Sequence, residues 1–174
     1  MEPIMAELST LTFSTVTGLQ FEDLVCLYRE AEPAHLRGLA PPRLKYYMRR
    51  SCLSRSEDQR VFFICSVPLT QDMHDPERPH LYDDGYRQLP VGILELEVSP
   101  YDPDEMWLKY ITVHPDYQRQ GIAKRLLAMM VEHMQAHPRL LQRSSASEEG
   151  AVKIQAYIDK LLEDTGIRWR QTGR

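Results

Sequence analysis

Apolar residues recur along the chain with two periods, and each period predicts one type of secondary structure. Alternation at every second position favours a strand, whereas an apolar stripe that repeats every 3.6 residues favours a helix. The segments with strand patterns are residues 11–16, 60–67, 90–98, 107–113, 139–145 and 166–169. The segments with helical patterns are residues 19–30, 43–52, 122–137 and 148–163. Strands and helices therefore alternate along the chain, which predicts an α/β fold.

Residues 67–89 interrupt this pattern. The segment is rich in proline and aspartate and is longer than a usual hairpin connection, which predicts an inserted acidic loop. Between residues 72 and 105 the chain has ten acidic and two basic residues. If this segment borders a pocket it favours a cationic ligand; the alternative is a charged loop in solvent.

The most informative local feature is the junction between strand 107–113 and the helix after it. The strand ends at His114-Pro115, because proline removes a donor from the ladder. The helix begins after Gly121, and its predicted buried stripe is Ile122, Leu126, Leu127, Met130, Val131 and Met134. Unpaired N–H groups in its first turn favour an anion, and Gly121 allows the backbone to approach that anion closely. The junction is therefore suited to a diphosphate.

The pattern Gln118-x-x-Gly121-x-Ala123, after a strand that ends Ile111-x-Val113-x-Pro115, resembles the acetyl-CoA-binding motif of the GNAT superfamily of N-acetyltransferases. The predicted order of strand, two helices, three strands and motif helix also resembles that family. The resemblance implies a single domain over residues 1–174, with a mixed, mostly antiparallel central sheet flanked by helices. It implies acetyl-CoA as co-substrate. The implied cofactor-binding residues are Ile111, Thr112, Val113, Gln118, Arg119, Gln120, Gly121, Ile122, Ala123 and Lys124.

In the resembled family the acceptor amine attacks the thioester directly, while a backbone N–H of the strand near residues 111–113 polarises the carbonyl. The amine must first lose a proton, because an alkylamine with a pKa of about 10.4 is protonated at pH 7. The carboxylates on or beside the two central strands are Glu95, Glu97 and Glu105, and Glu97 is our first choice of base. Each can instead be a solvated residue of the sheet. For His114 we expect a structural role in the loop.

The family often supplies an acid for the departing thiolate from a pattern resembling Leu-Tyr-x-x-x-Gly-Phe. The matching segment is Leu161-Leu162-Glu163-Asp164-Thr165-Gly166-Ile167, with leucine at the tyrosine position. Tyr157 lies five residues before Leu162, about 140° away around an ideal helix, so it substitutes only if the helix is placed differently. Tyr157 is our candidate acid; packing or surface exposure is its alternative role, and solvent is the alternative proton source.

The composition fits one globular domain, with 174 residues of which 43% are apolar. The net charge of −4 gives no general attraction to nucleic acid or to an anionic membrane. No apolar run approaches the roughly 18 residues that span a bilayer, and residues 1–10 lack a signal-peptide pattern, so a cytoplasmic location is the default expectation. The three cysteines, Cys26, Cys52 and Cys65, have no Cys-x-x-Cys spacing, and neither a disulfide framework nor a metal site is predicted.

The sequence thus predicts an N-acetyltransferase that uses acetyl-CoA and a primary amine on a small molecule, a protein or a peptide. Leu162 and the few residues after Trp169 keep a second hypothesis open, a CoA-binding regulatory or partner-binding module with weak or no catalysis. Family members commonly have a further C-terminal strand, so either it is missing here or another chain supplies it, as in a homodimer. A structural subunit with an open sheet edge is a third hypothesis.

Overall fold

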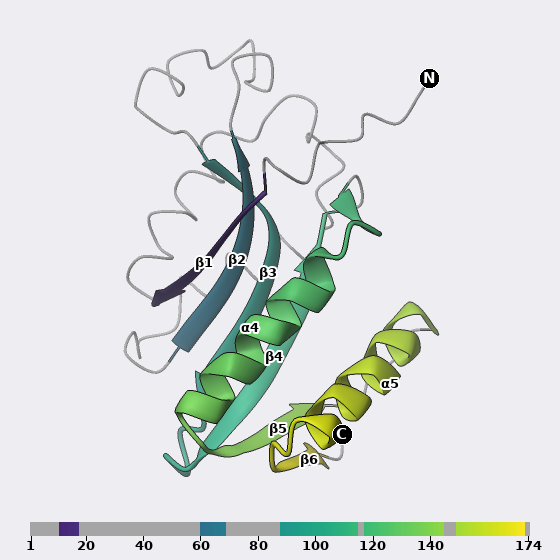
Figure 1. Cartoon of the computed structure of the whole chain (residues 1–174). Helices are drawn as coiled ribbons and strands as arrows, with labels where there is room; N and C mark the ends of the chain where they lie inside the picture. Colours follow the sequence, from purple (N-terminus) through teal and green to yellow (C-terminus); the bar gives the residue numbers. More distant parts are fainter. Residues whose placement is uncertain (1–10, 18–59, 69–87, 115–116, 145–148, 173–174) are drawn as a thin grey trace.

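The computed structural model of the chain describes residues 11–17, 60–68, 88–114, 117–144 and 149–172. They form one β-sheet with two long helices packed against it (Figure 1). The strands are β1 (Thr12–Thr17), β2 (Arg60–Pro68), β3 (Gln88–Val98), β4 (Glu105–Val113), β5 (Leu140–Ser144) and β6 (Trp169–Thr172). The helices are α4 (Ile122–Ala136) and α5 (Glu149–Asp164).

The sheet has the strand order β1-β2-β3-β4-β5-β6. Neighbours from β1 to β4 are antiparallel, whereas β4 pairs with β5, and β5 with β6, in parallel. A helix joins the strands of each parallel pair, α4 between β4 and β5 and α5 between β5 and β6. Figure 1 shows α4 lying along β3 and β4, and α5 beside β5 and β6. The predicted mixed, mostly antiparallel sheet is confirmed.

Predicted and observed elements agree to within two residues at each end, except at the last strand. That strand was predicted at residues 166–169, but β6 begins three residues later. Gly166 has a φ of +69°, and the Ile167 N–H donates to the Leu162 carbonyl over 3.1 Å. These residues therefore form the C-terminal cap of α5, which the period-two pattern did not distinguish from a strand. The predicted helices 19–30 and 43–52, and nearly all of the loop 67–89, lie outside the described residues.

The core covers both faces of the sheet: Phe63 and Leu94 share the face that Gly92 presents to α4, whereas Phe62, Ile64 and Ile93 lie on the opposite face. Its largest fully buried side chains are Phe62, Phe63, Ile64, Ile93, Leu94, Leu96, Met106 and Ile122. All six residues of the predicted stripe on α4 are buried, which confirms the helical period of that segment. Burial also raises the pKa of the Cys65 thiol to about 12, so that it stays protonated at neutral pH and behaves as a small core residue.

Helix α4 approaches β3 closely at Gly92, where an added Cβ would lie 2.7 Å from Ile122 Cγ2. We expect Gly92→Ala to lower the free energy of unfolding, measured in urea, by about 2 kcal/mol, because a buried branched side chain must move. Ile122→Leu removes that methyl at nearly constant volume, and it should restore part of the loss in the double variant. If Gly92→Ala costs the same with and without Ile122→Leu, the two side chains are not coupled.

Candidate functional site

A cavity of about 760 Å³ lies between the end of β4, the start of α4 and one side of α5. It brings together nine of the ten predicted cofactor-binding residues, all except Gln120. Tyr157, the predicted acid, also lines it. The lining residues that the sequence patterns did not indicate are Tyr117, Leu127, Lys153 and Ile154.

The turn before α4 is held in a conformation that few residues adopt. Gly121 has a φ of +79° and Arg119 a φ of +63°, so two left-handed residues lie close together. A Cβ added at Gly121 would meet nothing within 4 Å, and within this chain glycine is therefore required for its φ rather than for space. The side-chain amide of Gln118 donates to the Val113 carbonyl over 3.1 Å and connects the turn to the end of β4. Besides lining the cavity, the Gln118 side chain thus has a structural contact.

The first turn of α4 presents to the cavity N–H donors that have no partner within the helix. The first helical hydrogen bond runs from the Arg125 N–H to the Gly121 carbonyl over 3.0 Å. The N–H groups of Ile122, Ala123 and Lys124 precede it and have no acceptor within the helix. All three residues line the cavity, so the positive end of the helix is directed at it.

Strand β4 is irregular at Lys109. In the pairing with β3, the register passes from Leu108 directly to Tyr110, so Lys109 is the extra residue of a β-bulge. The pairing with β5 also ends at Leu108. Beyond this point no described strand pairs with the β4 edge that faces away from β3.

The open edge of β4 carries backbone N–H groups that no described strand pairs with. The His114 N–H donates to the Val91 carbonyl over 2.7 Å, which directs the backbone of His114 towards β3. Because backbone groups alternate between the two edges of a strand, Thr112 also faces β3, whereas Ile111 and Val113 face the open edge. The N–H groups of Ile111 and Val113 therefore point away from β3, at the cavity that both residues line.

The cavity has a positive lining in a chain whose net charge is −4. It contains Arg119, Lys124 and Lys153 and no acidic residue among those that the structure describes. The Lys124 ammonium lies 5.5 Å from the centre of the Tyr157 ring, so α4 and α5 meet across the cavity. This charge and the helix terminus together suit a ligand with several phosphates.

The position of α5 decides which of its side chains face the cavity. Lys153, Ile154 and Tyr157 form the cavity side, and Tyr157 is 37% exposed. Leu162, at the position where the family pattern has tyrosine, is fully buried in the core. A side chain at that position points into the core, whereas Tyr157 lines the cavity.

The predicted base lies away from this cavity. Glu97 pairs in register with Trp107, on the face of β3 opposite the side that Gly92 and Leu96 present to α4. Its carboxylate lies 3.0 Å from the Lys109 ammonium. The structure therefore places Glu97 beside the bulge of β4 but across the sheet from the cavity.

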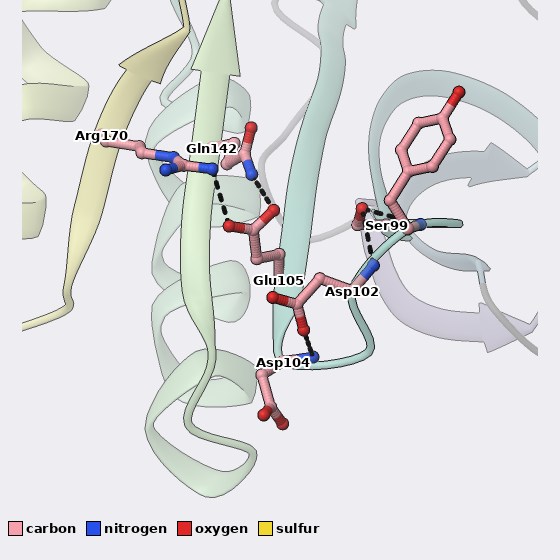
Figure 2. Close-up of polar contacts among 7 residues, drawn as sticks. Ser99, Asp102, Asp104, Glu105, Gln142 and Arg170 are labelled. Atoms are coloured by element: carbon pink, nitrogen blue, oxygen red, sulfur yellow. Dashed lines mark hydrogen bonds and ion pairs between the residues drawn. The ribbon is translucent and has the colours of Figure 1, made fainter.

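The other two candidate carboxylates have different surroundings. Glu95 is 5% exposed and pairs in register with Tyr110. Glu105 accepts hydrogen bonds from the side chains of Gln142 and Arg170, the latter over 2.7 Å, so that it links β4 to β5 and β6 (Figure 2). These contacts indicate a structural role for Glu105.

His114 is 1% exposed, and its ring meets Tyr117 edge-on with 5.8 Å between the ring centres. This buried position agrees with the structural role expected for it. The described residues contain no cluster of three or more His, Cys, Asp or Glu side chains that could hold a metal ion. None of the helices in the described segments is long and apolar enough to cross a membrane.

Comparison with known proteins gives an independent view of the chain. The family model for the acetyltransferase (GNAT) family matches residues 45–154. A Desulfovibrio desulfuricans protein assigned to the GNAT family is similar in structure, with 13% identity, a TM-score of 0.50, and coverage of 87% of this chain and 83% of that one. The ribosomal-protein-S18-alanine N-acetyltransferase of Escherichia coli is also similar, with 16% identity, a TM-score of 0.50, and coverage of 85% and 76%. At these identities the likeness concerns the fold, and a search of curated protein sequences gave no significant match.

Proposed function

Because the chain belongs to the GNAT family of acetyltransferases, we propose that it transfers the acetyl group of acetyl-CoA to a primary amine by direct attack in a ternary complex. Membership of the family confirms the enzyme class predicted from the sequence. The single observation that carries the proposal is the cavity where an open strand edge, a helix N-terminus and three cationic side chains converge. The proposed unit is one domain over residues 1–174, with residues 67–89 as its inserted loop.

The described residues fit the chemistry of acetyl-CoA. The first turn of α4 and the three basic side chains would bind the diphosphate and the remaining phosphate, which are the most charged parts of the molecule. The open edge of β4 would pair with the amide groups of the pantetheine arm. The Ile111 N–H, directed away from β3, would donate to the thioester oxygen as negative charge develops there.

The reaction needs a base that takes a proton from the amine and an acid that gives a proton to the thiolate. We place these two groups on opposite sides of the open edge of β4. Glu97 is the proposed base, because its carboxylate lies 3.0 Å from the ammonium of the bulge residue Lys109, on the face opposite the cofactor cavity, and is 18% exposed. Tyr157 is the proposed acid, because it supplies a hydroxyl to the cavity from α5. Both roles are proposals that rest on placement.

Removal of the Tyr157 hydroxyl tests the acid. Tyr157→Phe keeps the ring that Lys124 contacts, so we expect unchanged affinity for CoA and a rate about 10- to 100-fold lower, because the thiolate then leaves unprotonated. Stopped-flow or steady-state thiol release measures the rate, and calorimetry measures the affinity. An unaltered rate removes Tyr157 from the mechanism and leaves solvent as the proton source.

The function itself is tested by calorimetry with acetyl-CoA, followed by a thiol-release assay over a panel of amines. The panel should include aliphatic polyamines, amino sugars, lysine peptides and peptides with an N-terminal alanine, since one similar structure is a protein N-acetyltransferase by name. We expect acetyl-CoA binding and acceptor-dependent thiol release. The fully buried Leu162 favours one other candidate function, a CoA-binding module without chemistry, and binding without turnover for any amine would select it.

A further inference from the structure

The Lys109 side chain has surroundings that suit a reacting amine. Its Nζ lies 3.0 Å from the Glu97 carboxylate and 5.0 Å from the centre of the Trp107 ring. The side chains of Lys109 and Glu97 are 34% and 18% exposed, so the pair is partly shielded from water. A carboxylate and an aromatic face are the groups that hold an alkylammonium ion.

The position of Lys109 in β4 brings this amine next to the proposed thioester site. Lys109 is the bulge residue, and neither β3 nor β5 has a register partner for it. Ile111, whose N–H is the proposed donor to the thioester oxygen, lies two residues further along the same strand, roughly 7 Å away. The four-carbon stem of lysine is long and flexible enough to span that separation.

A second cavity, of about 290 Å³, adjoins Lys109 where β4 and β5 separate. It is lined by Trp107, Leu108, Lys109, Gln142, Arg143 and Thr172. The cavity gives the lysine side chain room to turn away from Glu97, and it gives an acetylated side chain a place to lie. An ordinary surface ion pair needs no such space beside it.

We propose that the active site acetylates Lys109 of its own chain. This inference rests on the proposed function. It deepens that function, because it identifies an aliphatic ammonium held between a carboxylate and an aromatic ring as the class of acceptor that the site takes.

The transfer balances without a further reactant. The Lys109 ammonium gives one proton to the Glu97 carboxylate, which passes it to solvent. The neutral nitrogen forms a bond to the thioester carbon, and the carbon–sulfur bond breaks. The second proton lost by nitrogen ends on the sulfur, so that acetyl-CoA and the ammonium become acetyl-lysine, CoA thiol and one proton. Acetylation removes the positive charge and releases Glu97 from the ion pair.

The experiment measures acetylation at each lysine by peptide mass spectrometry, after the full chain has been incubated with isotope-labelled acetyl-CoA. The chain has only five lysines, Lys45, Lys109, Lys124, Lys153 and Lys160. Lys160 is exposed on α5 and serves as the internal control for uncatalysed acetylation. We expect Lys109 to be labelled about 100-fold faster than Lys160, at a rate independent of protein concentration.

Two variants distinguish acetylation catalysed by the active site from uncatalysed acetylation of an exposed lysine. Glu97→Gln should bring labelling of Lys109 down to the level of Lys160 while CoA affinity, measured by calorimetry, is retained. Lys109→Arg keeps a cation beside Glu97 and should abolish the fast phase of labelling, without a new label elsewhere. A chain that binds acetyl-CoA but labels Lys109 no faster than Lys160 would overturn this inference alone, as would a rate that rises with protein concentration. A chain that does not bind acetyl-CoA would overturn the proposed function as well.

Discussion

Replacement of Gly121 by valine should weaken CoA binding at least about 100-fold, which corresponds to about 2.7 kcal/mol. The φ of +79° at Gly121 is costly for any residue with a Cβ and most costly for a β-branched one. Relief of that strain must rotate the peptide groups before α4, and the N–H groups that line the cavity would then no longer converge on one phosphate. Isothermal titration with CoA measures the loss.

Gly166 provides a matched control for this substitution. It also has a left-handed φ, +69°, and an added Cβ would meet nothing within 4 Å there either. It caps the C-terminal end of α5 and does not line the cavity. Gly166→Val should therefore lower the free energy of unfolding by about 1–2 kcal/mol, as much as Gly121→Val does. Unlike Gly121→Val, it should leave CoA affinity nearly unchanged. Equal CoA affinities for both variants would mean that the phosphates bind elsewhere.

The wall of the candidate site formed by β4 and α4 could be predicted because its information is local in the sequence. A strand end, a turn and the first turn of the next helix are consecutive, so one stretch of residues specifies both the geometry and the donors. The apolar stripe of α4 fixed the phase of that helix, and the six stripe residues are all buried. Nine of the ten predicted residues consequently line one cavity.

The remainder of the site depends on contacts between distant segments. Lys153 and Ile154 line the cavity because of the way α5 packs against β5, and a helical pattern alone does not give that orientation. The bulge at Lys109 arises from the register of β3 against β4, which has no local signature. The pairing of Glu97 with Lys109 follows from that bulge, and it could not be read from the alternation of Glu95 and Glu97 along one strand.

Asp159→Ala should lower the free energy of unfolding by about 3 kcal/mol, the largest stability loss that we predict for a single side chain. Arg143 on β5 is 5% exposed, and its guanidinium forms two bonds with the Asp159 carboxylate, of 2.7 and 2.6 Å. Loss of the carboxylate leaves a buried cation without this counter-charge, which costs more than the pair itself contributes. The contact between Arg143 and Asp159 also holds α5 over β5. The substitution should therefore displace Lys153 and Tyr157, which line the cavity from α5, and so weaken CoA binding. Urea unfolding and CoA titration measure the two effects.

Two further variants distinguish this pair, in which Arg143 is buried and Asp159 is 30% exposed, from charge in general. Asp164→Ala removes the same group from an exposed position on the same helix, and it should change stability by less than about 0.5 kcal/mol. Arg143→Met combined with Asp159→Leu removes both charges, and it should recover much of the stability lost in Asp159→Ala, because no unpaired ion remains in the core. If the double variant is instead less stable than Asp159→Ala, the guanidinium contributes mainly through its packing on Trp169, whose ring centre lies 5.0 Å from it. If the two aspartate variants are equally stable, the bond between Arg143 and Asp159 does not fix the position of α5.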